Sequence, residues 1–140
     1  MVLTPGTVLY LWFPMVRPYP KEKFAILGAI EPAPMLLFID SDVNPFVNHT
    51  EELVRHHLQI AQATHPFLAY DSWVDCTYPV GYDLEGLKYA VHHNPEIVKA
   101  AISDDLRSLI CDCVSTSKLW PPAKKQRFVA ALSARTPFEF

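Results

Sequence analysis

Polar and aromatic side chains that could take part in chemistry gather between residues 71 and 75. Two carboxylates, a hydroxyl and an indole lie together in this short segment, on Asp71, Ser72, Trp73 and Asp75. Such a set could line a substrate groove in which Trp73 stacks on a nucleic-acid base. The simpler interpretation is a turn at Asp71 and Ser72, followed by a strand that places Trp73 in the core. The sequence leaves both interpretations open.

A second polar group, Asp40-Ser41-Asp42, directly follows an apolar run, a position where functional loops are common. Its two carboxylates could share a metal ion or a proton. The simpler interpretation is a turn in which these side chains bond to their own backbone. The basic residues between 124 and 127 could likewise contact phosphate or an acidic partner, or form the solvated face of a helix.

Histidines and cysteines do not form a recognisable metal site. Four of the six histidines form two adjacent pairs, at 56–57 and 92–93, and neighbouring residues of a strand point to opposite faces. No cysteine or carboxylate lies beside them at a spacing typical of zinc sites. Cys111 and Cys113 are two residues apart on an expected helix, so they do not face each other. We therefore expect no metal and no cofactor, histidines that are exposed or half-buried, and Cys113 in the core.

Length and composition indicate one globular domain. The chain has 140 residues, of which 50% are hydrophobic and 19% are charged, so it is not a disordered polymer. It has no apolar run long enough to span a membrane, and its apolar start lacks the basic residues of a signal peptide. Three cysteines argue against a disulfide framework. We therefore expect a cytoplasmic protein without membrane association, and the net charge of −3 argues against nucleic-acid binding by charge alone.

Closely spaced prolines mark several short strands in the first 80 residues, because proline is confined to strand ends and edges. Gly28 lies inside one of the apolar runs, where it predicts a bulge or a close backbone approach. The stretch 52–62 fits either a helix face or strand alternation, and we favour a strand because its neighbours are strands. The runs together predict strands at residues 7–13, 23–30, 35–39, 52–62, 67–70 and 73–78.

Helical patterns follow residue 81. A short helix is expected at 84–92, and a second begins after Ser103, a good N-cap followed by two aspartates. The apolar positions of this second helix fall on one face, which comprises Leu106, Leu109, Ile110, Cys113 and Val114. A third helix begins at Pro122. We predict one α+β domain, mainly β, over residues 1–140, with strands of a small barrel in 1–80 and helices that pack on it in 81–140. The tail 136–140 could dock on this barrel or on a partner.

Several segments occur in a characteristic order. The order begins with Pro5 to Tyr10, a basic loop with Arg17, and Lys23 to Leu27. It continues with the apolar segment Leu36 to Ser41 and later with Phe67 to Val74. This order resembles the PemK/MazF toxin family of toxin–antitoxin systems. The resemblance covers roughly residues 5–115 and lies in the order of elements more than in identity.

The resemblance implies an SH3-like barrel of five to seven short strands with C-terminal helices, usually dimeric. Members of the family cleave single-stranded RNA without a metal, and an antitoxin inhibits them. Lys23 and Ser41 match positions of the family's site, although lysine offers a point charge where the family's arginine offers a bidentate fork. The resemblance implies that these two are catalytic. The expected substrate-binding residues are Arg17, Asp71, Ser72, Trp73 and Asp75.

Two functions are therefore expected from the sequence. One is a PemK/MazF-like endoribonuclease or RNA-binding protein. Metal-free cleavage of RNA needs a base for the 2′-hydroxyl, an acid for the leaving oxygen and a cation for the charged phosphorane. The alternative is a non-catalytic SH3-like barrel that serves as a protein-interaction module of a mobile element or prophage. The acidic net charge favours the alternative, and so does the presence of Lys23-Phe24 where the family has an Arg-Pro pair. The expected partners are single-stranded RNA, an antitoxin-like protein and a second copy of the chain in a homodimer.

Overall fold

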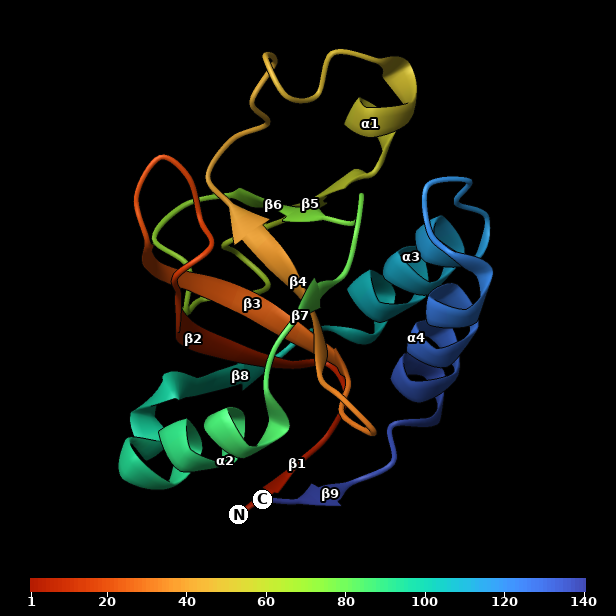
Figure 1. Ribbon diagram of the computed structural model, residues 1–140. Coiled ribbons are helices and arrows are strands. Elements are labelled where there is room, and N and C mark those ends of the chain that lie inside the picture. The colour runs from red at the N-terminus through yellow and green to blue at the C-terminus, as the bar shows by residue number, and fades with distance from the viewer.

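A strongly curled antiparallel sheet is the centre of the protein, with helices on both sides (Figure 1). The computed structural model describes all 140 residues. The strands of this sheet follow the order β5-β6-β4-β3-β2-β8, and β7 pairs with β4. Their bounds are β2 (Thr7–Phe13), β3 (Lys21–Ala29), β4 (Met35–Asp40), β5 (His57–Ile60), β6 (Ser72–Asp75), β7 (Val80–Gly81) and β8 (Val98–Ala101).

The predicted fold class is confirmed: the protein is an α+β, mainly β structure with a small SH3-like half-barrel of seven short strands and C-terminal helices. The hydrogen-bonded path is open between the edge strands β5 and β8. The curled sheet therefore wraps around a core without closing into a continuous ring. A separate pair, β1 (Val2–Leu3) and β9 (Phe138–Glu139), brings the two ends of the chain together.

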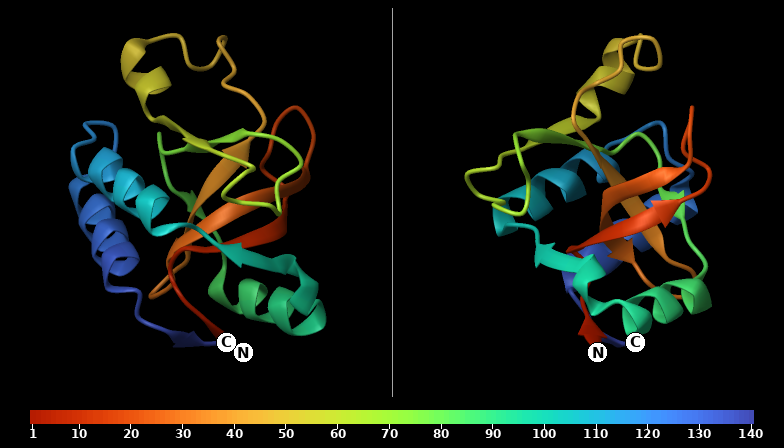
Figure 2. Two further views of the ribbon diagram at one scale, coloured as in Figure 1. Left: turned by 180° about the vertical axis from the view of Figure 1, so that it is seen from behind. Right: turned by 90° about the vertical axis from the view of Figure 1, so that its left-hand side faces the viewer.

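Four α-helices and one 3-10 turn complete the fold. Both views of Figure 2 place α3 (Asp104–Ser115) beside α4 (Pro122–Ala134) on one side of the sheet. On the other side lie α2 (Leu84–His93) and η1 (Pro95–Ile97), while α1 (Glu51–Arg55) lies beyond the end of β4. The predicted cap of α3 is confirmed, because the Ser103 hydroxyl accepts a hydrogen bond from the Leu106 N–H at 3.1 Å.

The strands β2, β3 and β4 contribute side chains to two cores, one on each face of the sheet, whereas β5 and β6 contribute only to the core under α3 and α4. In β3, Ile26 faces the core under α3 and α4, whereas Ala25 and Leu27 face the core under α2. The pairing with β4 shifts between Leu27 and Ala29, so Ala29 faces the α3–α4 core instead. The bulge predicted at Gly28 is therefore present, and it moves the following side chains to the opposite face.

Several local predictions were wrong. The stretch 52–62 is not one strand: α1 occupies its first part and β5 its second. Thr50 explains the helix, because its side chain accepts a hydrogen bond from the Leu53 N–H at 3.2 Å and caps the first turn. Residues 67–70 form turns and not a strand, and β6 ends at Asp75. Leu109, predicted on the apolar face of α3, is 53% exposed.

The C-terminal tail docks on its own chain. The Phe140 N–H donates to the Met1 carbonyl at 2.7 Å, and the terminal ammonium of Met1 pairs with Glu139 at 2.9 Å. Phe140 is buried in the core under α2. The tail and β8 thus both join strands from the first half of the chain, so the half expected to be mainly helical also supplies strands to the β structure.

Candidate functional site

An open cleft of about 470 Å³ lies where β3 begins and β4 ends. The start of β3 supplies Lys21 to Phe24, and the end of β4 supplies Asp40, followed by the exposed loop 41–48. His57 of β5 and Asp75 of β6 line the same cleft. The antiparallel order β3-β4-β6-β5 brings these ends together, so residues from 10 to 75 meet at one mouth of the half-barrel.

Lys23 and Asp40 form an ion pair in this cleft. The two residues continue the register in which Ala25 pairs with Phe38, so they lie opposite each other on neighbouring strands. The Lys23 ammonium also lies 4.7 Å from the centre of the Phe38 ring. Their side chains are only 14% and 24% exposed. Asp40 therefore holds the lysine in place and neutralises much of its charge.

His57 and Asp75 form a second cross-strand pair in the cleft. The Nε2 atom of His57 lies 3.7 Å from Oδ1 of Asp75. Nδ1 lies 2.9 Å from the Leu53 carbonyl, which can only accept, so Nδ1 carries the proton of the neutral ring. Asp75 is fixed in turn, because its Oδ1 accepts from the N–H of Thr77 at 2.9 Å and from its hydroxyl at 2.5 Å. The unprotonated Nε2 is thus positioned to accept a proton next to a carboxylate.

The structure brings three of the predicted site residues together. Lys23, Ser41 and Asp75 all line the cleft, and Ser41 is exposed just past the end of β4. Ser72 is buried, donates to the Tyr70 carbonyl at 3.1 Å, and lines a smaller pocket of about 110 Å³ that also includes Ser41. The end of β4 and the end of β6 thus both contribute to the cleft.

The other predicted residues lie outside the cleft. Arg17 is exposed on the loop between β2 and β3. Asp71 accepts a hydrogen bond from the Gln62 N–H at 2.9 Å and so closes the loop between β5 and β6. Trp73 is half-buried within β6 and does not line the cleft, whose tyrosines are Tyr10 and Tyr70.

Sequence reasoning missed His57 as a site residue. The adjacent pair does point to opposite sides, since His57 lines the cleft while His56 bonds to Ser117 on the far side. Both rings are buried, however, at 2% and 8% residue exposure for His56 and His57, so the prediction of exposed or half-buried histidines was wrong for this pair. The alternation of β5 is the signal that could have identified His57, but the residues of α1 directly precede β5 and hide where the strand begins.

Acidic groups outnumber lysines in the cleft. Its lysines, Lys21 and Lys23, face four carboxylates, from Glu22, Asp40, Asp42 and Asp75. Lys21 makes no ion pair, so it is the one cation in the cleft that is available to an incoming anion. No three His, Cys, Asp or Glu side chains converge so as to hold a metal ion. The cleft can therefore offer proton transfer and hydrogen bonding, with one free positive charge.

None of the helices combines the length and the apolar character that a membrane crossing requires. No family model matches the chain, and neither a curated protein nor a solved structure matches it.

Proposed function

We propose that the protein is a PemK/MazF-like RNA-binding protein whose cleft cleaves single-stranded RNA without a metal. One observation carries the proposal: Lys23 and Ser41, the two residues that match the family's site by position, line the same open cleft as the His57–Asp75 pair. A cation, a hydroxyl donor and an acid–base couple are the groups that this reaction requires.

The proposed chemistry assigns one role to each group. Nε2 of His57 takes the proton of the ribose 2′-hydroxyl, with Asp75 stabilising the imidazolium that forms. The 2′-oxygen attacks phosphorus, the bond to the 5′-oxygen breaks, and a 2′,3′-cyclic phosphate results. The leaving oxygen takes a proton from the site or from water. Lys21 and Lys23 face the charged phosphorane, and the Ser41 hydroxyl donates to one of its oxygens.

The proposal includes a cytoplasmic location, a homodimer and inhibition by an antitoxin-like protein. The location is supported by three free cysteines, which fit a reducing compartment. The partners are supported by the family resemblance alone. A small acidic reading frame beside the gene would add support for an antitoxin.

A second function is favoured by the charge of the cleft. Four carboxylates against two lysines repel a polyanion, and one of the lysines is already paired. The same cleft suits a lysine or arginine side chain of a protein partner. In this case the protein is a non-catalytic SH3-like module that binds a basic segment.

RNA cleavage by the purified full chain in the presence of a metal chelator tests the first function. We expect products with 2′,3′-cyclic phosphate ends, and we expect activity to be lost in Lys23→Ala and Ser41→Ala. Lys88→Ala is the matched control, because Lys88 lies on α2 and pairs with Glu85 away from the cleft. Intact RNA with well-folded protein, no growth arrest on expression and capture of one stable protein partner would favour the second function instead.

A further inference from the structure

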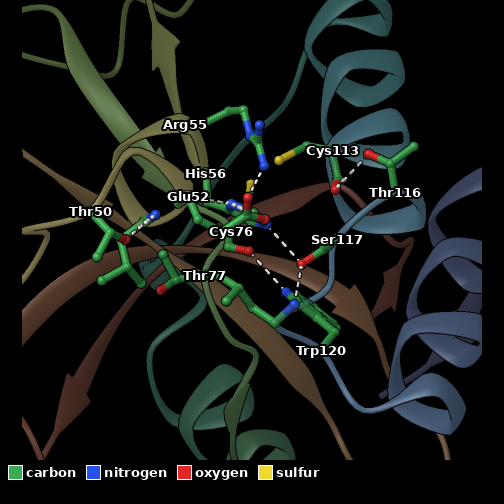
Figure 3. A network of polar contacts seen from close by, with 12 residues as sticks. Thr50, Glu52, Arg55, His56, Cys76, Thr77, Cys113, Thr116, Ser117 and Trp120 are labelled. Carbon is green, nitrogen blue, oxygen red and sulfur yellow. Dashed lines mark hydrogen bonds and ion pairs between the residues drawn. The ribbon is translucent and has the colours of Figure 1, made fainter.

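Two cysteines that are far apart in the sequence, Cys76 and Cys113, meet outside the lining of the candidate cleft. Cys76 directly follows β6 and is fully buried, whereas Cys113 lies in α3 and is half-buried. Their thiol groups face each other closely enough for each to influence the protonation of the other. Figure 3 shows the two sulfur atoms beside one another, and it shows the Arg55 guanidinium, which pairs with Glu52, on the side of Cys113.

Only one of the two thiols is open to a small molecule. A second cavity of about 600 Å³ is lined by Cys113, together with Arg55, His56 and Ser117, but not by Cys76. The backbone of Cys76 is fixed on both sides, because its N–H donates to the His56 carbonyl at 2.9 Å and its carbonyl accepts from the Trp120 indole at 2.8 Å. The pair thus consists of one accessible sulfur and one held behind it.

The charges around the pair distinguish the two thiols further. The hydrogen bond from Cys76 and the positive charge of Arg55 lower the pKa of Cys113, although burial opposes them. The same hydrogen bond, together with burial, raises the pKa of Cys76 well above its ordinary value. Because Cys76 is fully buried and Cys113 lines the cavity, Cys113 is the group that loses a proton first, with the Cys76 thiol beside the thiolate that forms. An accessible thiolate next to a protonated thiol is the arrangement of a reactive and a resolving cysteine.

We propose that Cys113 and Cys76 form a redox site, in which Cys113 reacts with a hydroperoxide and Cys76 resolves the product to an intramolecular disulfide. No residue lines both the candidate cleft and the cavity beside Cys113, so the proposal does not rest on the proposed function. The hydroperoxide is the oxidant, and the cavity in front of Cys113 is where it enters.

The reaction has two balanced steps. The Cys113 thiolate attacks one oxygen of the hydroperoxide, so an S–O bond forms and the O–O bond breaks. The departing oxygen takes a proton and leaves as water or an alcohol. The sulfur of Cys76 then attacks the sulfenic sulfur of Cys113, the S–S bond forms, the S–O bond breaks, and the hydroxyl leaves as water with the Cys76 proton. The two thiols lose two electrons in total, and the hydroperoxide gains them.

The disulfide would link the end of β6 directly to α3. Asp75 precedes Cys76 in the chain and is the residue that pairs with His57 in the cleft. The Cys76–Cys113 disulfide would therefore involve the residue that directly follows Asp75 of the cleft in the chain. A thiol reductant would reverse it and restore the free pair.

Cys111 provides a control within the same helix. It is half-buried like Cys113 but contacts the Ser133 hydroxyl at 3.5 Å on α4, and it does not line the second cavity. Its position two residues from Cys113 points it away from Cys76. A reaction governed only by exposure would modify both cysteines of α3, whereas the proposed site predicts selective reaction at Cys113.

The test treats the reduced full chain with a small excess of hydrogen peroxide and analyses it by intact mass and peptide mapping without reductant. We expect the mass to fall by two hydrogen atoms and the map to contain a Cys76–Cys113 cross-link, in wild type and in Cys111→Ser alike. Cys76→Ala should instead accumulate a sulfenic acid at Cys113, detected with a cyclic 1,3-diketone probe. Arg55→Gln should slow the reaction by about three- to tenfold, because the cation beside Cys113 is removed.

We expect Arg55→Gln to fold like wild type, because the Arg55 side chain is 69% exposed, so a slower reaction in this variant does not result from unfolding. A further measurement needs no variant: the rate of alkylation at Cys113 in wild type should exceed that at Cys111. Faster reaction at Cys111, or oxidation of Cys113 to sulfinic acid without any link to Cys76, would overturn the proposal.

Discussion

The ring of Phe128 on α4 fills the space beside Gly28 of β3. A side-chain carbon built at Gly28 would lie 1.9 Å from Cε2 of Phe128, far inside van der Waals contact. Phe128 is fully buried and also stacks edge-on against Trp120, with 5.0 Å between the ring centres. The close approach of helix and strand thus depends on the absence of a side chain at residue 28.

Gly28→Ala should therefore destabilise the fold. Because Phe128 is packed on all sides and cannot withdraw, we expect a loss of about 1–3 kcal/mol in the free energy of unfolding. Urea unfolding followed by far-ultraviolet circular dichroism measures this loss. Gly81→Ala is the matched control, since no atom lies within 4 Å of its added carbon. Equal stability of the two variants would contradict the packing argument.

The Lys23–Asp40 pair gives a test that separates the two proposed functions. Asp40→Asn removes a carboxylate from the cleft and frees the Lys23 ammonium. If the ligand is RNA, we expect its affinity to rise by about tenfold at low salt and to depend more steeply on salt. If the ligand is a basic protein segment, the same change should weaken binding. Fluorescence anisotropy with a labelled single-stranded RNA and with a lysine- and arginine-rich peptide measures both.

Two controls make the sign of this change interpretable. Thermal unfolding of Asp40→Asn must show that the variant remains folded, because Lys23 loses its partner. Glu85→Gln removes a carboxylate from α2, away from the cleft, and should leave both affinities unchanged. An equal effect of both variants would mean that the net charge of the protein governs binding and that the cleft does not.

Most of the fold was predictable because its signals are local. The β-branched and apolar runs that form β2 and β4, and the Ser103 cap of α3, are each recognisable within a few residues. The strand β8 carries no such signal, since its sequence is Val-Lys-Ala-Ala. It is a strand because it pairs with Thr7 to Leu9 of β2, some ninety positions earlier in the chain.

The candidate site was predictable only in part. Lys23 and Ser41 meet because β3 and β4 are consecutive antiparallel strands, which the sequence pattern indicates. The His57–Asp75 pair depends on the register between β5 and β6, and that register could not be derived once α1 had been merged with β5. The contact between Cys76 and Cys113 depends on how α3 packs against the sheet, which no local pattern specifies.

His56 should make stability depend on pH. Its Nδ1–H donates to the Glu52 carbonyl at 2.6 Å, and its Nε2 lies 2.7 Å from the Ser117 hydroxyl, which donates to it when the ring is neutral (Figure 3). Burial, followed by the charges of Arg55 and His57, lowers the pKa of His56 below its ordinary value of 6.5. The unfolded chain therefore binds a proton more readily, and this contribution to stability is lost as the pH falls from 6.5 through the lowered pKa.

Urea midpoints between about pH 7.5 and about pH 5 measure this dependence. We expect the midpoint of wild type to fall toward the acidic end, and His56→Gln to lose part of that slope because glutamine does not titrate. His93→Gln is the control, since His93 is exposed at the end of α2. The same slope in wild type and His56→Gln would show that another group is responsible.

Arg107 should be the most important charged residue for stability. It is 7% exposed, and its Nη1 donates to the carbonyls of Pro5 at 2.8 Å and Leu132 at 2.9 Å. One guanidinium thus joins α3, the end of α4 and the turn before β2, where Gly6 has a φ of 101° and leaves room for it. Arg107→Ala leaves two buried carbonyls without donors and opens a cavity, so we expect a loss of about 3 kcal/mol in the free energy of unfolding.

Arg127→Ala is the matched control for this loss. Arg127 also donates to two carbonyls, of Glu31 at 3.4 Å and Ala33 at 3.1 Å, but these contacts are exposed to solvent. Water can replace its guanidinium, so its removal should cost less than about 1 kcal/mol. Arg107→Lys should recover only part of the stability, because a lysine ammonium on its single stem does not reproduce the planar fork. Full recovery in Arg107→Lys would show that charge alone, and not the geometry of the guanidinium, holds the three segments together.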